Sequence, residues 1–235
     1  LKNNVDNLKK VSYRYLFRLY AFIFIKQMNK LPKGATAILV ILLVIISDQV
    51  LKIWVKTNMY LGEPIEIASW IIIKFVENNG MAFGLEVMGK LFLSVFRIIA
   101  ISFIGYYLYR LIKGGAKNGY IACISLVLAG AFGNIIDSVF YGEIFTESTY
   151  NQIASFAPIG EGYSSWLHGK VVDMFYFPLF EGTFPSWIPV IGGNHFEFFS
   201  AIFNIADSAI TVGMVLLILF YRRTLSESFQ TNAKK

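Results

Sequence analysis

The sequence predicts an all-α membrane protein, a four-helix transmembrane bundle that carries a small extracytoplasmic β element. Hydrophobic residues make up 56% of the 235 residues, and charged residues make up only 15%. The hydrophobic residues gather in long runs, and about 20 consecutive apolar residues are enough to cross a bilayer as a helix. Soluble domains have a smaller apolar share and shorter apolar runs, so the composition indicates a polytopic membrane protein.

Four apolar runs are long enough to span a membrane, and they lie at residues 35–56, 91–112, 119–141 and 197–221. The first run follows a basic segment and has no small-residue cleavage site, so we expect a retained helix rather than a removed signal peptide. We divide the chain into a cytoplasmic basic segment at 1–34, a membrane domain at 35–221 and a cytoplasmic tail at 222–235.

Charged residues orient the predicted bundle. Lysine and arginine collect in the N-terminal segment, around the connection at 113–118 and in the tail, whereas the connections at 57–90 and 142–196 are rich in glutamate. Cytoplasmic segments carry the excess of Lys and Arg, so we expect both termini on the cytoplasmic side. The net charge of +6 then reflects topology and contact with anionic membrane lipid, and the sequence has no nucleic-acid-binding motif.

The first 27 residues are basic and rich in Tyr and Phe. They fit an amphipathic helix on the inner leaflet, or an extension upstream of a start at Met28, which we favour.

The two acidic connections are expected to be ordered on the outer face. Residues 69–76 are rich in Ile and end near an Asn-Gly turn signal, which predicts a strand-rich unit in segment 57–90. Segment 142–196 is long for a connection, and its Trp166 and Trp187 suit a membrane interface.

The sequence offers few ligands for a metal. Cys123 is the only cysteine, and His168 and His195 are the only histidines, so we expect no internal disulfide, no Cys/His metal site and no cofactor. We interpret Cys123 as a small packing residue, His168 as a solvated loop group and His195 as interfacial or structural.

Two nearly identical pentapeptides lie in apolar runs, NIIDS at 134–138 and NIADS at 204–208. Their Asn and Asp are three residues apart and therefore share one helical face. An Asp at a helix centre costs roughly 2.5–3.5 kcal/mol on insertion scales, and an intramembrane acid usually marks a functional site that faces the bundle interior.

Helix geometry predicts the depth of the acids. At 1.5 Å per residue, Asp48, Asp137 and Asp207 all fall in the outer half of the bilayer. Asp207 is expected roughly 15 Å below the outer end of a helix that begins near residue 197.

Five stretches carry a family resemblance, and in chain order they are DQVLK at 48–52, NNGMAFG at 78–84, GAFGNIID at 130–137, GKVVD at 169–173 and FNIADSAI at 203–210. Together they resemble the lipoprotein signal peptidases (signal peptidase II), bacterial four-helix membrane aspartyl proteases, over residues 35–221. The resemblance implies an inner-membrane enzyme, with its active site toward the outer face, that removes signal peptides from diacylglyceryl-modified prolipoproteins just before the lipid-modified Cys. We expect it to act as a monomer.

The resemblance implies that Asp173 and Asp207 are the catalytic pair. Peptide hydrolysis needs a base that activates water and an acid that protonates the departing amine, and two carboxylates that share one proton supply both. The residues alone would favour a pair of Asp137 and Asp207, because the repeated pentapeptide relates them. The family pattern moves the choice to Asp173.

Nine further candidates are expected to bind substrate or to hold the carboxylates in place: Asp48, Lys52, Asn79, Gly80, Ala82, Asn134, Asp137, Asn204 and Ala206. Asp48 and Lys52 are four residues apart, so they form either a structural pair, with Lys52 extending toward the interface, or a direct substrate contact. Asn79, Gly80 and Ala82 resemble a substrate-contacting loop of the family, although Asn-Gly also indicates a plain turn.

The chain departs from the family pattern at two places. Most members follow the third-stretch Asp with Arg, and here that residue is Ser138, so the role of that Arg passes to another group such as Lys170. An insertion around 181–196 either lengthens an outer flap or decorates the surface.

Two other functions fit the intramembrane acids. A small proton-coupled transporter could use Asp48, Asp137 and Asp207 as a relay, and a non-catalytic assembly factor could use polar groups to join helices. Asp173 distinguishes these from a protease, because neither needs an acid in the outer loop.

Overall fold

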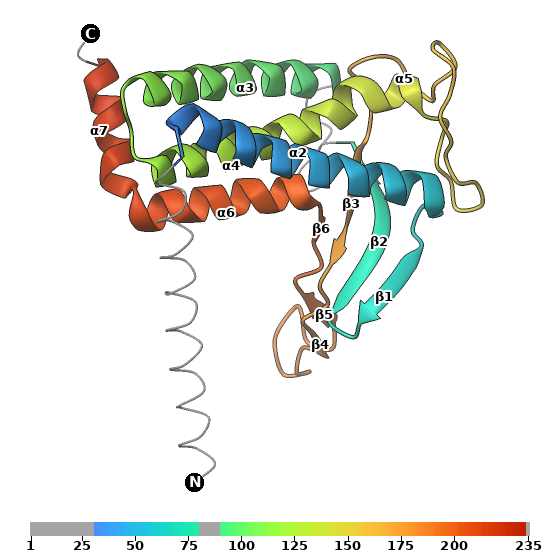
Figure 1. Ribbon diagram of the computed structural model, residues 1–235. Helices are drawn as coiled ribbons and strands as arrows, with labels where there is room; N and C mark the ends of the chain where they lie inside the picture. Colours follow the sequence, from blue (N-terminus) through green and yellow to red (C-terminus); the bar gives the residue numbers. More distant parts are fainter. Residues whose placement is uncertain (1–30, 80–89, 234–235) are drawn as a thin grey trace.

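The computed structural model describes residues 31–79 and 90–233 (Figure 1). The basic segment at 1–27 and the candidate residues Gly80 and Ala82 lie outside the described residues.

Helices form a bundle that fills most of the molecule (Figure 1). The helices are α2 (Lys33–Asn58), α3 (Lys90–Lys113), α4 (Asn118–Ile136), α5 (Gly142–Ile144), α6 (Ile205–Phe220) and α7 (Arg222–Ala233), and a π-helical turn, η1 (Asp137–Tyr141), joins α4 to α5. Three of these, namely α2, α3 and α4 with its continuation to α5, are long and apolar enough to cross a membrane. The pair α6 and α7, bent by 92°, raises the possible number to four if it counts as one span.

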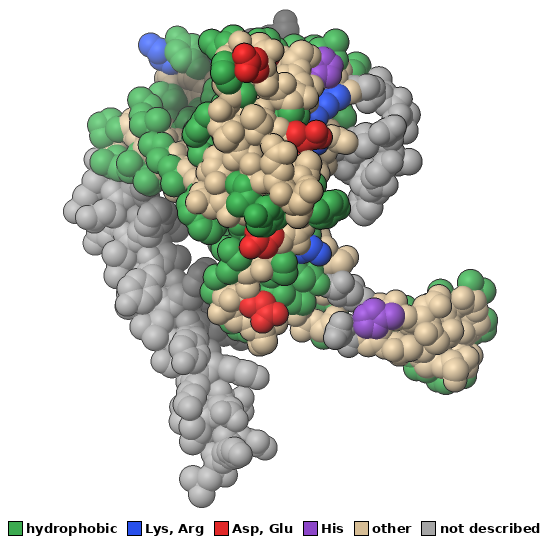
Figure 2. Space-filling view, turned by 90° about the vertical axis from the view of Figure 1, so that its right-hand side faces the viewer, with side chains coloured by type: hydrophobic (Ala, Val, Ile, Leu, Met, Phe, Trp, Pro, Cys, Tyr) green, Lys and Arg blue, Asp and Glu red, His purple; other side chains and the backbone are tan. Residues whose placement is uncertain are grey.

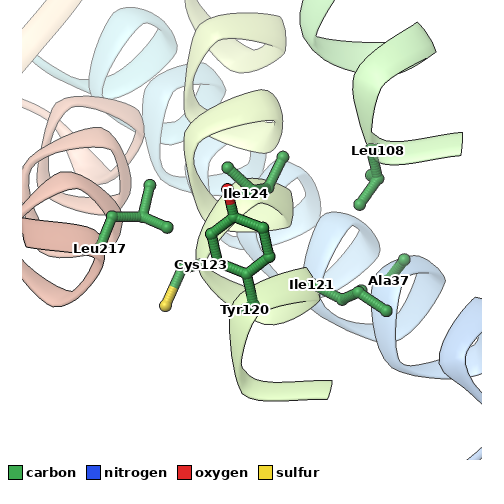
Figure 3. Close-up of a cluster of buried hydrophobic side chains, with 7 residues drawn as sticks. All are labelled: Ala37, Leu108, Tyr120, Ile121, Cys123, Ile124 and Leu217. Carbon is green, nitrogen blue, oxygen red and sulfur yellow. The ribbon is translucent and has the colours of Figure 1, made fainter. Parts of the chain in front are cut away.

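Apolar side chains pack against one another at the end of the bundle where α6 meets α7, and Figure 3 shows them in close-up. The cluster contains Ala37, Leu108, Tyr120, Ile121, Cys123, Ile124 and Leu217. Cys123 is buried in this cluster with a free thiol, which agrees with a packing role.

Small residues let α4 pack closely against its neighbours. A Cβ added at Gly130 would meet the backbone oxygen of Ala206, and one added at Gly133 would come 2.8 Å from a carboxylate oxygen of Asp48. Such close backbone approach at small residues is typical of helix contacts in membranes. It brings the polar residues of α2, α4 and α6 within reach of one another.

A four-stranded antiparallel sheet stands beside the other end of the bundle (Figure 1). Its strands, in spatial order, are β1 (Pro64–Ala68), β2 (Ile71–Asn78), β3 (Val171–Tyr176) and β6 (Ile202–Phe203). A second, two-stranded sheet pairs β4 (Phe180–Thr183) with β5 (His195–Phe198). The predicted β element is therefore present, and it is larger than segment 57–90 alone.

The sheet packs on the bundle through a second apolar cluster, made of Val55, Met59, Phe75, Tyr141, Phe145, Val172 and Met174. Because Val172 and Met174 are buried neighbours of Asp173 on β3, this packing fixes the strand that carries a predicted catalytic residue.

The predicted start of the fourth helix near residue 197 is wrong. The helix begins at Ile205, and the apolar residues before it form β5 and β6, where Phe203 pairs with Phe175 of β3. Apolar runs of this length do not distinguish a strand from a helix. Asp207 consequently lies in the first turn of α6, and the predicted depth of about 15 Å below the helix end is wrong as well.

Candidate active site

The predicted site residues gather where the bundle meets the sheet. They come from the C-terminal half of α2, the end of α4 with η1, strand β3 and the start of α6. Asp48, Asp137, Asp173 and Asn204 are all buried. Buried polar groups of this kind need partners, and the partners define the site.

Lys52 is the central residue of one half of the site and contacts three polar side chains. Its ammonium nitrogen lies 2.9 Å from Asp48 Oδ2 and 2.8 Å from Asp137 Oδ2, and it donates a hydrogen bond of 2.9 Å to Asn134 Oδ1. The side chain is fully buried. The predicted pairing with Asp48 is present, but Lys52 does not extend toward the interface, because three acceptors hold it inside the bundle.

The two carboxylates on Lys52 also hold backbone groups of neighbouring elements. Asp48 Oδ1 accepts a hydrogen bond of 2.9 Å from the backbone N–H of Ala206. Asp137 Oδ2 accepts one of 3.2 Å from the backbone N–H of Val172. These contacts tie the start of α6 and strand β3 to the same lysine.

Asn204 joins the other half of the site. It caps α6, since its Oδ1 accepts the backbone N–H of Asp207 at 2.9 Å. Its Nδ2 lies 2.7 Å from Asp173 Oδ1 and 3.0 Å from Asn134 Oδ1. Asn134 in turn donates a hydrogen bond of 2.7 Å to Asp207 Oδ1. Two asparagines therefore connect the carboxylates of Asp173 and Asp207.

The electrostatic setting of Asp173 differs from that of an ordinary surface acid. Burial and the nearby charge of Asp207 raise the pKa of Asp173 to about 7. Hydrogen bonds from Asn78 (3.2 Å) and Asn204 and the charge of Lys52 oppose this shift. A carboxyl group with this pKa is partly protonated at neutral pH, so it can donate a proton.

Arg97 of α3 lies beside Ser138. Its guanidinium donates a hydrogen bond of 3.2 Å to Ser138 Oγ, and it interacts electrostatically with the carboxylates of Asp207, Asp137 and Asp173. Sequence reasoning missed Arg97, although an arginine in a membrane-spanning run is itself a signal of function.

Lys170, which the sequence suggested for this place, lies in a different cluster. Its ammonium is 3.0 Å from Glu77 Oε2 and sits 5.3 Å from the ring centre of Tyr163. Lys56 is buried in the same cluster, where it donates hydrogen bonds to Glu77 and to Ser148. This second cluster attaches the long segment between η1 and β3 to β2, and Lys170 pairs with Glu77 there rather than with a group beside Ser138.

Two other residues that the sequence analysis named make contacts of their own. Asn79 is exposed and accepts a hydrogen bond from Lys90 at 3.4 Å. The Nδ1 of His168 contacts Ser165 Oγ at 3.1 Å and the backbone oxygen of Trp166 at 2.9 Å. Within residues 31–79 and 90–233, no group of three or more His, Cys, Asp or Glu could hold a metal ion.

Comparison with known proteins gives consistent matches. The family model for signal peptidase (SPase) II matches residues 40–223. A lipoprotein signal peptidase of Porphyromonas gingivalis is 52% identical over 200 residues, which cover 85% of this chain and 88% of that protein. The lipoprotein signal peptidase of Amoebophilus asiaticus is 37% identical over 80% of this chain and 78% of that protein.

One solved structure adds a likeness in fold. It is a bacterial membrane enzyme, determined by the in meso method at 2.3 Å resolution, and it is 28% identical in sequence. The TM-score is 0.53, and the match covers 82% of this chain and 91% of the solved chain.

Proposed function

Since this chain belongs to the signal peptidase II family, we propose that it works as an aspartic endopeptidase in which Asp173 and Asp207 are the catalytic pair. The chain removes signal peptides from prolipoproteins in a bacterial membrane. The transporter considered as an alternative finds no support among these relatives.

The observation that carries the proposal is the link through Asn204. Its side-chain nitrogen is 2.7 Å from Asp173, and its side-chain oxygen accepts the backbone N–H of Asp207. One residue thus orients both carboxylates from the start of a single helix, whose N-terminal dipole favours the charge of Asp207. Rigid placement of both groups is what acid–base catalysis on one water molecule needs.

The partners of Asp137 argue against the other pair. Asp137 is fully buried, and its oxygens accept hydrogen bonds from Gln49 (2.9 Å), Lys52 and the backbone of Val172. A fully buried carboxylate whose oxygens are held by a lysine and two further donors has no open side from which a water molecule or a substrate could reach it. We assign Asp137, with Asp48, Lys52 and Asn134, to holding the pair in place.

The pair can divide the proton transfers of peptide hydrolysis. Ionised Asp207 takes a proton from the attacking water, whose oxygen bonds to the carbonyl carbon. Protonated Asp173 gives its proton to the carbonyl oxygen, and the carbon–nitrogen bond then breaks as the departing amine receives a proton from the pair. Two acids that share one proton titrate together, so the pH dependence belongs to the pair.

The proposed substrate is a prolipoprotein that carries a diacylglyceryl group on Cys, cut just before that Cys. Its lipid keeps the scissile bond at the membrane surface, and the site lies at the end of the bundle that also carries the acidic connections. The basic residues Lys113, Arg222 and Arg223 lie at the opposite end. We therefore propose a monomer with four spans, α2, α3, α4 and α6, with cytoplasmic termini and a site that opens outward.

A cleavage assay tests the reaction class. The purified chain in micelles should cut a diacylglyceryl-modified prolipoprotein peptide just before the modified Cys, as mass spectrometry of the products would show, and it should leave the unmodified peptide largely uncut. A chelator should not change the rate. If a chelator abolished cleavage and zinc restored it, the aspartic mechanism would be wrong.

A further inference from the structure

The β4–β5 hairpin projects from the molecule as a separate arm. Its two strands pair only with each other in the described sheets, and the arm stands away from the body at the lower right of Figure 2. Figure 1 shows it to the side of the bundle, below the start of α6 and at an angle to the helix axes. An isolated two-stranded hairpin is at best marginally stable in water, so the arm needs a partner.

Backbone hydrogen bonds hold the loop at the tip of this arm, residues 184–194. The backbone N–H of Phe184 bonds to the oxygen of Asn194 at 2.9 Å, and the N–H of Gly193 bonds back to the oxygen of Phe184 at 2.9 Å. Phe180 and Phe198 stack at its base, with ring centres 4.4 Å apart. The tip therefore presents its side chains from a fixed backbone.

The side chains at the tip are apolar and face outward. Trp187 is 79% exposed and Val190 is 99% exposed, with Ile191 beside them at 40%. Val190 has a φ of 72°, which is uncommon for a β-branched residue and needs support from the loop around it. Residues 182–194 contain no charged residue. An exposed apolar patch without charge marks a surface that binds an apolar partner.

The apolar surface continues from the arm onto the main sheet. At the base of the arm, Phe199 packs edge-on against Phe203, which stacks on Phe177, and Phe177 stacks on Trp70. Trp70 is 58% exposed. Aromatic residues that are apolar on one side and wet on the other are typical of membrane interfaces.

We propose that the β4–β5 hairpin inserts its tip into the outer leaflet of the membrane that surrounds the bundle. The bilayer is the nearest apolar partner, because the spanning helices lie beside the arm. An uncharged tip with a tryptophan is suited to the boundary between lipid headgroups and acyl chains. The hairpin joins two strands of the main sheet. One is β3, which carries Asp173, and the other is β6, which leads into α6 and Asp207. Insertion holds the sheet side of the site against the membrane surface.

Fluorescence of Trp187 tests the proposal without reference to catalysis. The chain has four tryptophans, and a variant with Trp54→Phe, Trp70→Phe and Trp166→Phe keeps only Trp187. In vesicles of phosphatidylcholine with brominated acyl chains, its emission should be quenched, and acrylamide in the water should quench it weakly. Because the tip is uncharged, raising the salt concentration should not release it.

Two further variants make the result decisive. Val190→Asp, at a side chain that is 99% exposed, leaves the packing of the chain unchanged and should abolish most of the bromine quenching. The matched control carries its only tryptophan through Ile159→Trp, at an 86% exposed position in the outer loop, and should be quenched by acrylamide alone. Thermal unfolding in micelles should be the same for each variant.

Two outcomes overturn the proposal. If acrylamide quenches Trp187 as strongly as the tryptophan at position 159 and brominated lipid does not, the arm lies in water. If Trp187 responds only when a lipid-modified peptide is added, the arm contacts substrate and not the bilayer.

Discussion

Replacing Lys52 with methionine should destabilise the fold strongly and abolish turnover as a consequence. The ammonium of Lys52 lies within 2.9 Å of Asp48, Asp137 and Asn134, and methionine has a similar length without the charge. The change leaves two carboxylates buried without a counter-charge. Removing one partner of a buried ion pair costs about 3–5 kcal/mol, a shift of roughly 10²–10⁴ in the folding equilibrium.

The effect can be measured as a thermal shift in detergent micelles. In a chain of this size each kcal/mol lowers Tm by about 2–4 °C, so we expect a drop of roughly 6–20 °C. Lys113→Met is the matched control, because Lys113 is exposed at the other end of the bundle, and it should keep the wild-type Tm. Adding Asp48→Asn and Asp137→Asn to Lys52→Met should recover part of the loss. If Lys52→Met alone kept the wild-type Tm and turnover, the central role given to this lysine would be refuted.

Three further predictions concern the acids, the helix contact and the arginine. Because the pKa of Asp173 is about 7, kcat/KM should fall as the pH rises above that value and the donor proton is lost, and a flat profile from about pH 6 to about pH 9 would contradict this. Gly130→Ala should lower the Tm measured in micelles, because the added methyl group meets the backbone of α6. The control Gly105→Ala should keep the wild-type Tm, because no atom lies within 4 Å of the added methyl group. Arg97→Gln should reduce turnover, and adding Ser138→Arg should restore part of it, since the side chains at positions 97 and 138 are in contact. If the single and the double variant lost the same turnover, an arginine at position 138 would not replace the charge of Arg97.

Apolar runs predicted α2, α3 and α4 well, because long hydrophobic stretches have few alternatives to a helix in a membrane. Strand β2 was also predictable, since residues 71–76 are rich in β-branched and aromatic residues. The start of α6 was not, because the apolar residues before it gain their hydrogen bonds from β3, far away in the sequence. A pattern along the chain does not contain that pairing.

The site was only partly predictable for a related reason. The spacing of Asp48 and Lys52 indicated a pair, but only the fold shows that Asp137 and Asn134 share the same lysine. The contact between Arg97 and Ser138 joins residues 41 positions apart. Lys170 looked available because it precedes the β3 acid, and its pairing with Glu77 depends on a strand contact that sequence spacing does not reveal.

The most direct test of the account compares single Asp173→Asn and Asp207→Asn variants on a diacylglyceryl-modified prolipoprotein peptide, with Glu161→Gln, at an exposed loop residue, as control. Each site variant should lose about 10²–10⁴-fold in kcat, because a positioned acid or base contributes that much, while peptide binding and Tm stay near the wild-type values. The control should keep full turnover. Near-normal turnover of Asp173→Asn, with the loss appearing instead in a stably folded Asp137→Asn variant, would contradict the account.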